Sequence, residues 1–220
     1  MLNQWLISAL QLKALPNEPP NAKVCIMKLN DTSNVLAFLK SRKSASAKAM
    51  TGPGPSKVQM DEILEIAVRV PDHGKLAPWR FILCEGEGRA RMGQGFADVW
   101  IKNNPTQGTE ILDFQRGLFM RAPVILVVVS TAAVHGKIPV WEQQMSSATV
   151  CYNAVLAATA LGFDAQWQSD WVAYDEAAKA VMGVRPHEKV SGIVYIGTSS
   201  VILEDRPRPD VSSLLTRINS

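Results

Sequence analysis

The sequence predicts one α+β domain, because strongly apolar strand-like runs alternate with segments of helical periodicity. Residues 123–130, Pro-Val-Ile-Leu-Val-Val-Val-Ser, are apolar on both faces, which is typical of a central strand. Residues 190–198 form a second buried strand, and residues 141–161 form a long, largely apolar helix that needs cover from the sheet or from a second subunit. No repeat, low-complexity tract or linker follows residue 55, so these elements belong to one domain.

Proline, glycine and capping residues set the boundaries of the elements. Pro105 separates two helical stretches, Gly162 and Gly183 each follow the last periodic residue of a helix, and Arg206-Pro-Arg-Pro209 excludes regular structure at that point of the tail. Periodicity and composition predict helices at residues 31–42, 56–69, 89–103, 106–120, 141–161 and 175–182, strands at residues 79–85, 123–130, 164–169 and 190–198, and a turn at residues 86–88.

The first helix has an apolar face formed by Val35, Leu36 and Leu39, and the acidic and hydroxyl residues at positions 31–33 can cap it. Residues 1–30 are predicted to be an appendage to a domain of residues 31–220. Their apolar patch lacks the basic region and the cleavage site of a signal peptide, and Met27 is a candidate start just before the first strong helix.

Composition excludes several classes of protein. The net charge of +3 is too mild, and too evenly spread, to indicate nucleic-acid binding. No apolar run is long enough to span a bilayer. The three cysteines are widely spaced, without a disulfide or metal-ligand pattern, which favours reduced thiols in a cytoplasmic protein without a metal site.

The stretch from Arg69 to Arg80 is the leading candidate for a ligand-binding loop. Two prolines stiffen it, and Asp72, His73 and Lys75 lie between them. A stiff loop with convergent polar groups suits a binding site held by a scaffold. The alternative is a rigid turn held by a local hydrogen bond between Asp72 and His73.

Two further basic clusters accompany this loop: Arg42-Lys43-Ser44, and Arg206 with Arg208. Alone, the first is a favourable helix C-terminus and the second a solvated tail. Together with the loop they indicate an anionic ligand, since arginine forks and hydroxyls hold phosphate. The sequence has no phosphate loop, dinucleotide fingerprint or nucleophile elbow, so a bound cofactor explains the chemistry better than side chains alone.

An ordered set of motifs across residues 33–217 resembles the FMN-dependent nitroreductase family, and within it the short YdjA-like NAD(P)H nitroreductases. Each motif is weak alone, but their order is specific. They are Ser41-Arg-Lys-Ser-Ala-Ser46, Arg69-Val-Pro-Asp-His73, Pro78-Trp79, Glu85-Gly-Glu-Gly-Arg89, Pro139-Val-Trp-Glu-Gln143, Gly162-Phe163 before Trp167-Gln-Ser169, and Glu188-Lys-Val190 before Tyr195-Ile-Gly-Thr198.

The resemblance implies an α+β fold with a central, mostly antiparallel sheet flanked by helices, in an intertwined homodimer with FMN at the interface. It implies that NAD(P)H donates hydride and that no side chain is catalytic, because the flavin carries the chemistry. The implied cofactor-binding residues are Arg42, Lys43 and Ser44 at the phosphate and ribityl end, Arg69, His73 and Lys75 at the isoalloxazine, Trp167, Gln168 and Ser169 closing the site, and Arg206 and Arg208 as further phosphate ligands.

Several positions depart from the family pattern. Lys43 replaces a commoner second arginine, Gln168 stands where near relatives have arginine, and Lys75 takes a position often filled by asparagine. These changes leave FMN binding expected, while substrate and nucleotide preference do not carry over. The expected acceptor is a nitroaromatic, a quinone or a similar electron-poor molecule. The alternatives are a flavin reductase or dehalogenase-like enzyme on the same fold, or an FMN-binding protein with low turnover.

Overall fold

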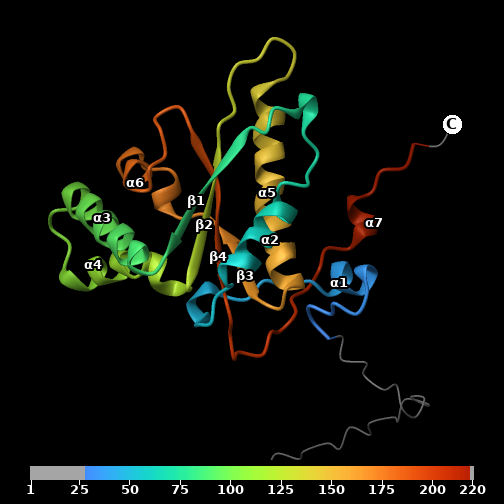
Figure 1. The fold of residues 1–220 in the computed structure, drawn as a ribbon, viewed down its shortest axis with the longest axis horizontal. Helices are drawn as coiled ribbons and strands as arrows, with labels where there is room; N and C mark the ends of the chain where they lie inside the picture. Colours follow the sequence, from blue (N-terminus) through green and yellow to red (C-terminus); the bar gives the residue numbers. More distant parts are fainter. Residues whose placement is uncertain (1–27, 219–220) are drawn as a thin grey trace, which may run out of the picture.

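The computed structural model describes residues 28–218, and they form a sheet with helices on both faces (Figure 1). The predicted appendage of residues 1–30 lies almost wholly outside the described residues, so it stays a prediction. No helix of the described part is both long and apolar enough to cross a membrane.

The sheet has four strands in the order β1-β2-β4-β3, and every neighbouring pair is antiparallel. The prediction of an antiparallel α+β sheet is therefore confirmed. The strands are β1 (Trp79–Glu85), β2 (Val124–Ser130), β3 (Asp164–Gln168) and β4 (Lys189–Gly197).

Helices cover both faces of this sheet, as Figure 1 shows. One layer consists of α2 (Lys57–Ala67) and α5 (Val140–Ala160); the opposite layer contains α3 (Glu87–Asn103), α4 (Thr109–Arg116) and α6 (Glu176–Val181). All seven residues of β2 are buried, and alternate side chains enter the two separate cores. This explains why β2 is apolar throughout.

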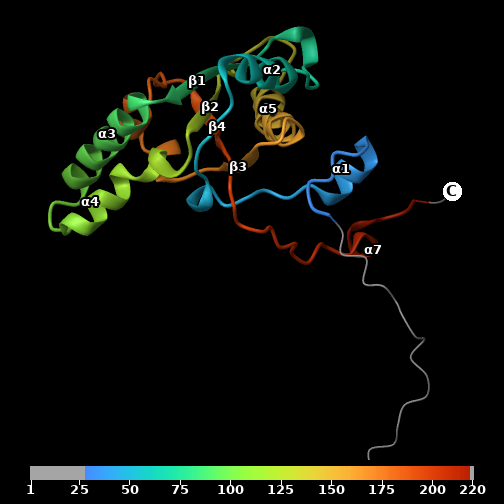
Figure 2. The same cartoon turned by 60° about the horizontal axis from the view of Figure 1, so that its bottom comes forward.

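Two short helices lie outside these layers, on the side of α5 (Figures 1 and 2): α1 (Val35–Ser41) and α7 (Val211–Leu214). The N-cap of α1 is Asn34, whose side chain accepts from the amide of Ala37, so the predicted start at residues 31–33 is too early. Val35 and Leu36 are largely exposed. The predicted apolar face of α1 therefore exists but has no partner among the described residues of one subunit.

Several other boundaries differ from the predicted ones, mostly by one or two residues. The stretch 106–120 is not one helix, because α4 ends before Gly117 and the 3-10 turn Leu118–Arg121 follows. The predicted turn at 86–88 is instead the start of α3, which begins at Glu87 after Gly86 adopts a positive φ of 50°. Strand β3 ends at Gln168, one residue earlier than predicted.

Helix α5 is covered on only part of its circumference. It packs against α2, β2, β3 and β4, yet Trp141 and Tyr152 remain 69% and 43% exposed, and Met145 is similarly open. These three residues recur at helical spacing and form one apolar stripe. We call Trp141, Met145 and Tyr152 the α5 stripe.

Candidate functional site

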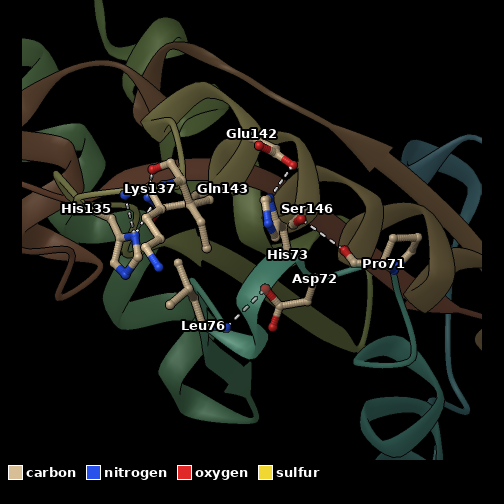
Figure 3. Close-up of polar contacts among 10 residues, drawn as sticks. Pro71, Asp72, His73, Leu76, His135, Lys137, Glu142, Gln143 and Ser146 are labelled. Atoms are coloured by element: carbon tan, nitrogen blue, oxygen red, sulfur yellow. Dashed lines mark hydrogen bonds and ion pairs between the residues drawn. The ribbon is translucent and has the colours of Figure 1, made fainter.

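Helix α5 holds the Arg69–Arg80 loop through two polar side chains. Ser146 Oγ donates to the carbonyl of Pro71 at 2.9 Å (Figure 3). About two turns of α5 further along, Asn153 Nδ2 donates to the carbonyls of Ile66 and Arg69, at 2.5 and 3.3 Å. The start of the loop is therefore fixed against a rigid element, as a ligand-binding loop requires.

The middle of the loop is folded by Asp72. Its carboxylate accepts from the amides of Leu76 and Ala77 at 3.2 and 2.8 Å, and Lys75 and Ala77 both have positive φ. The alternative of a local Asp72–His73 hydrogen bond is wrong, because both Asp72 oxygens serve these backbone amides. Lys75 lies at the end of a 3-10 turn that begins at His73.

The imidazole of His73 contacts α5 instead. Its Nδ1 lies 2.9 Å from Oε1 of Glu142, in the first turn of that helix (Figure 3). Both residues line an open pocket of 480 Å³ together with Met145 and Thr149. Sequence reasoning missed Glu142, although it stands in one of the motifs that mark the family. Glu142, Ser146 and Asn153 are spaced so that all three face the loop side of α5, and this polar spacing in an apolar helix was a usable signal.

The far end of the loop is fixed by Arg80. Its Nε and Nη2 donate to the two oxygens of Glu188 at 2.8 and 2.6 Å, and Nη2 also donates to the carbonyl of Gly183. Glu188 additionally accepts from the backbone amide of Arg185. The hydrogen bond from Arg80 lowers the pKa of the Glu188 carboxyl to about 2, although burial of that carboxyl acts to raise it. Arg80, at the end of the loop, thus joins β1 to Glu188, the residue immediately before β4.

The first basic cluster lies beside α5 as well. Arg42 donates from Nη1 to Ser44 Oγ at 3.3 Å, and its guanidinium lies 5.7 Å from the ring centroid of Tyr152. The backbone amide of Lys43 donates to Asn30 Oδ1 at 2.8 Å. The cluster therefore has a defined shape, and neither Arg42 nor Lys43 has a described carboxylate at ion-pair distance.

The tail brings the second basic pair to the first cluster. The pKa of Asp205 is lowered by the backbone amide of Arg206, by a hydrogen bond from Arg208 and by the nearby charge of Lys43. Arg208 Nη2 lies 2.6 Å from Asp205 Oδ1. Arg208 pairs with Asp205, and the charge of Lys43 acts on the same carboxylate without an ion pair, so the tail runs near the first cluster.

Trp167, Gln168 and Ser169 lie on and just after the edge strand β3. Trp167 is half-exposed, and its indole lies so close to Gly192 that a Cβ there would overlap Nε1. The same Cβ would approach Cys151 of α5. The hydroxyl of Tyr174 hydrogen-bonds Ser169 Oγ at 2.9 Å, while Gln168 pairs with β4.

Three of the predicted groups converge on one short stretch of α5. Trp167 lies near Cys151 across Gly192, Arg42 lies over Tyr152, and the carbonyl of Arg69 bonds Asn153. The side chains of successive helix residues point about 100° apart. These three groups therefore lie at the same level of α5 but on different sides of it. The structure thus brings together groups that are distant in sequence.

The cations of this region are suited to an anionic ligand. Within the described part of the chain, Arg208 is the one cation of the predicted site with a carboxylate at ion-pair distance. The predicted cations without one are Arg42, Lys43, Arg69, Lys75 and Arg206. Guanidinium and ammonium groups without a carboxylate partner, together with a hydroxyl such as that of Ser44 beside Arg42, form the donor set that phosphate needs. These residues fit a phosphorylated cofactor.

The region offers little for chemistry by side chains alone. Burial raises the pKa of the Cys151 thiol to about 12, which leaves it protonated and unreactive. Residues 28–218 contain no group of His, Cys, Asp and Glu able to hold a metal ion. Fold and site together define a class: an α+β protein with a cation-rich site suited to binding a cofactor.

Comparison with known proteins identifies the family within this class. The profile of the nitroreductase family matches residues 39–198, and the chain belongs to the nitroreductase family. It is 34% identical over 167 residues to "Putative NAD(P)H nitroreductase YdjA" of Escherichia coli K12, covering 75% of this chain and 88% of the relative. A Haemophilus influenzae relative, "Putative NAD(P)H nitroreductase", is 35% identical over 166 residues, with the same coverage of 75% and 88%.

Solved structures share the fold. A nitroreductase-like family protein from Bacillus cereus aligns with a TM-score of 0.72 and 22% identity over 83% of this chain and 94% of its own. A nitroreductase with bound FMN from Bacteroides fragilis aligns with a TM-score of 0.62 and 20% identity over 84% of this chain and 98% of its own. The predicted resemblance to the nitroreductase family is therefore confirmed, as is the fold class.

Proposed function

We propose that this protein is an FMN-dependent oxidoreductase. It takes hydride from NAD(P)H and passes two electrons to a nitroaromatic, a quinone or a similar electron-poor acceptor. The proposal is carried by one arrangement: Arg42, which has no carboxylate at ion-pair distance among the described residues, and the His73 loop both lie against α5. The names of the E. coli and H. influenzae relatives support the nucleotide donor, and the FMN bound to the B. fragilis nitroreductase supports the cofactor.

The residues divide by the part of FMN that they suit. Arg42, Lys43 and Ser44 would hold the phosphate and ribityl end, with Arg206 and Arg208 supplying further charge. Bound FMN would supply the hydride-accepting and hydride-donating chemistry that the side chains lack.

The remaining predicted residues suit the ring. Arg69, His73 and Lys75 would place donors and positive charge beside it, which favours its reduced, negatively charged form for the reason that donors stabilise an oxyanion. Trp167, Gln168 and Ser169 would close the site from the edge strand.

We further propose a homodimer and a cytoplasmic location. The α5 stripe and the apolar face of α1 expose large side chains that a second copy would cover, and exposed apolar patches of this kind mark association surfaces. The buried, unpaired thiols of Cys84 and Cys151 fit a reducing compartment.

A binding experiment tests the cofactor assignment. Replacing Arg42 with Ala removes a charge-assisted phosphate contact and should weaken FMN binding by about 1.5–3 kcal/mol, measured by quenching of flavin fluorescence. The matched control is Lys40→Ala, which removes an exposed positive charge from the same helix. Equal FMN affinity in the two variants would contradict the assignment. Oxidation of NADH and NADPH with a panel of acceptors then separates a nitroreductase from a flavin reductase, a dehalogenase-like enzyme or a low-turnover binding protein.

A second experiment tests the dimer. Met145→Glu places a charge in the α5 stripe and should shift the protein toward monomer in sedimentation velocity runs, because burying an unpaired charge is costly. Phe114→Glu is the control, since Phe114 is also about half-exposed but lies on α4, on the opposite face of the sheet from α5. A wild-type monomer, or a Met145→Glu dimer as stable as the control, refutes the proposed interface.

A further inference from the structure

In the motif Pro139-Val-Trp-Glu-Gln143, only Trp141 has a part in what is proposed so far, as a member of the α5 stripe. Gln143 accounts for some of the rest: buried at the start of α5, its Nε2 donates to the carbonyls of Ala133 and Ile138, and its Oε1 accepts from the amide of Ala133. These bonds tie the loop between β2 and α5 to the helix. Glu142 has no such backbone role; its recorded partner is His73.

We propose that Glu142 is a positioning residue that holds His73 in the Nδ1–H tautomer and so makes Nε2 the nitrogen offered to a ligand. When ionised, the carboxylate of Glu142 can accept a hydrogen bond but cannot donate one, and it lies 2.9 Å from Nδ1. That contact is a hydrogen bond only if Nδ1 carries the proton. The neutral imidazole then has its lone pair at Nε2. That the ligand is the FMN ring rests on the proposed function.

Both partners of this bond are held in place. Glu142 lies in the first turn of α5, next to the buried Gln143. His73 follows Pro71, whose carbonyl is held by Ser146 one turn along the same helix. Both side chains therefore stand on backbone segments that other contacts hold in place. Orienting the imidazole against Glu142 then costs little additional entropy.

No other described acid competes for His73. The neighbouring Asp72 uses both oxygens for backbone amides of its own loop. Glu142 is thus the group that decides which ring nitrogen carries the proton, in the same way that a second partner sets the tautomer of a functional histidine.

The pair is poorly placed to serve stability. The side chains of His73 and Glu142 are 60% and 42% exposed, and exposed ion pairs contribute little to folding. Loss of Glu142 should therefore leave the fold intact while it frees the imidazole. This separation makes the proposal testable.

The experiment is nitrogen NMR on protein labelled with ¹⁵N-histidine, without added FMN and at pH 8.5. The chain has three histidines, so the spectrum is simple, and His73→Gln assigns the signal. His135 is an internal reference for the opposite tautomer, because its Nδ1 accepts from the amides of Lys137 and Ile138. The matched variants are Glu142→Ala and Glu110→Ala, which removes an exposed acid from the first turn of α4.

We expect His73 to show the Nδ1–H pattern in the wild type and in Glu110→Ala, and to move toward the Nε2–H pattern of His135 in Glu142→Ala. An Nε2–H pattern in the wild type, or an unchanged pattern in Glu142→Ala, overturns the assignment. If the protein is then loaded with FMN, the flavin absorption maximum should differ between Glu142→Ala and Glu110→Ala, and identical spectra overturn the extension to the ring. Wild-type protein that binds no FMN refutes the proposed function, while the tautomer result is decided independently.

Discussion

Replacing Glu188 with Gln removes the negative charge that Arg80 binds at the end of the Arg69–Arg80 loop. Glu188 is fully buried, and the pKa of its carboxyl falls from an ordinary 4.5 to about 2, mainly through the hydrogen bond from Arg80. Each pKa unit corresponds to about 1.4 kcal/mol, so this fall in pKa means that the ionised Glu188 stabilises the folded state by about 3 kcal/mol. Because the pKa is lowered in the folded state, this contribution is complete above about pH 5 and is lost as the pH falls toward 2.

Urea unfolding of the wild type and Glu188→Gln between pH 7 and pH 3 measures this contribution. The difference in unfolding free energy between the two should be constant from pH 7 to pH 5 and should shrink by about 2 kcal/mol at pH 3, because most of the linkage lies between the two pKa values. Asp61→Asn, which breaks the exposed pair with Lys57, is the control and should follow the wild type across the range. A difference that stays constant down to pH 3 refutes the reasoning.

Two glycines give further predictions. Gly93→Ala places a methyl group against the backbone carbonyl of Arg116 between α3 and α4, so it should destabilise the protein by about 1–3 kcal/mol or more in urea unfolding. Gly136→Ala, in a loop with open space around it, should change little, and equal stability of the two variants would contradict the packing argument. Gly192→Ala should displace the indole of Trp167, seen as a shift in tryptophan fluorescence, and an unshifted spectrum would mean that the indole does not lie against Gly192.

Local patterns predicted the elements well. The predicted strand at 79–85 coincides with β1, and the predicted helix at 141–161 differs from α5 by one residue at each end. These elements have a buried side that dictates their pattern. The failures have a different cause: Gly117 ends α4 inside a periodic stretch, and the apolar face of α1 has no partner within the described part of one subunit.

The cofactor-binding residues stay a prediction, and the sequence did not reveal which distant groups they contact. The contact between Arg42 and Ser44 spans two positions, so it follows from the sequence around it. The contact between His73 and Glu142 spans 69 positions and exists only because α5 packs beside the loop. The sequence shows both residues, yet only the order of elements in space shows that they meet.

The attachment of the loop to α5 limits how the length of this protein can vary. His73 is held at Glu142, the carbonyl of Pro71 at Ser146 and the carbonyl of Arg69 at Asn153. One residue inserted between these anchors would turn the following anchors by about 100° and move them about 1.5 Å along the axis. The loop could then keep some of its contacts but not all of them. Insertions and deletions in related chains that retain this arrangement should therefore fall outside this part of α5, in the connections at either end of the helix.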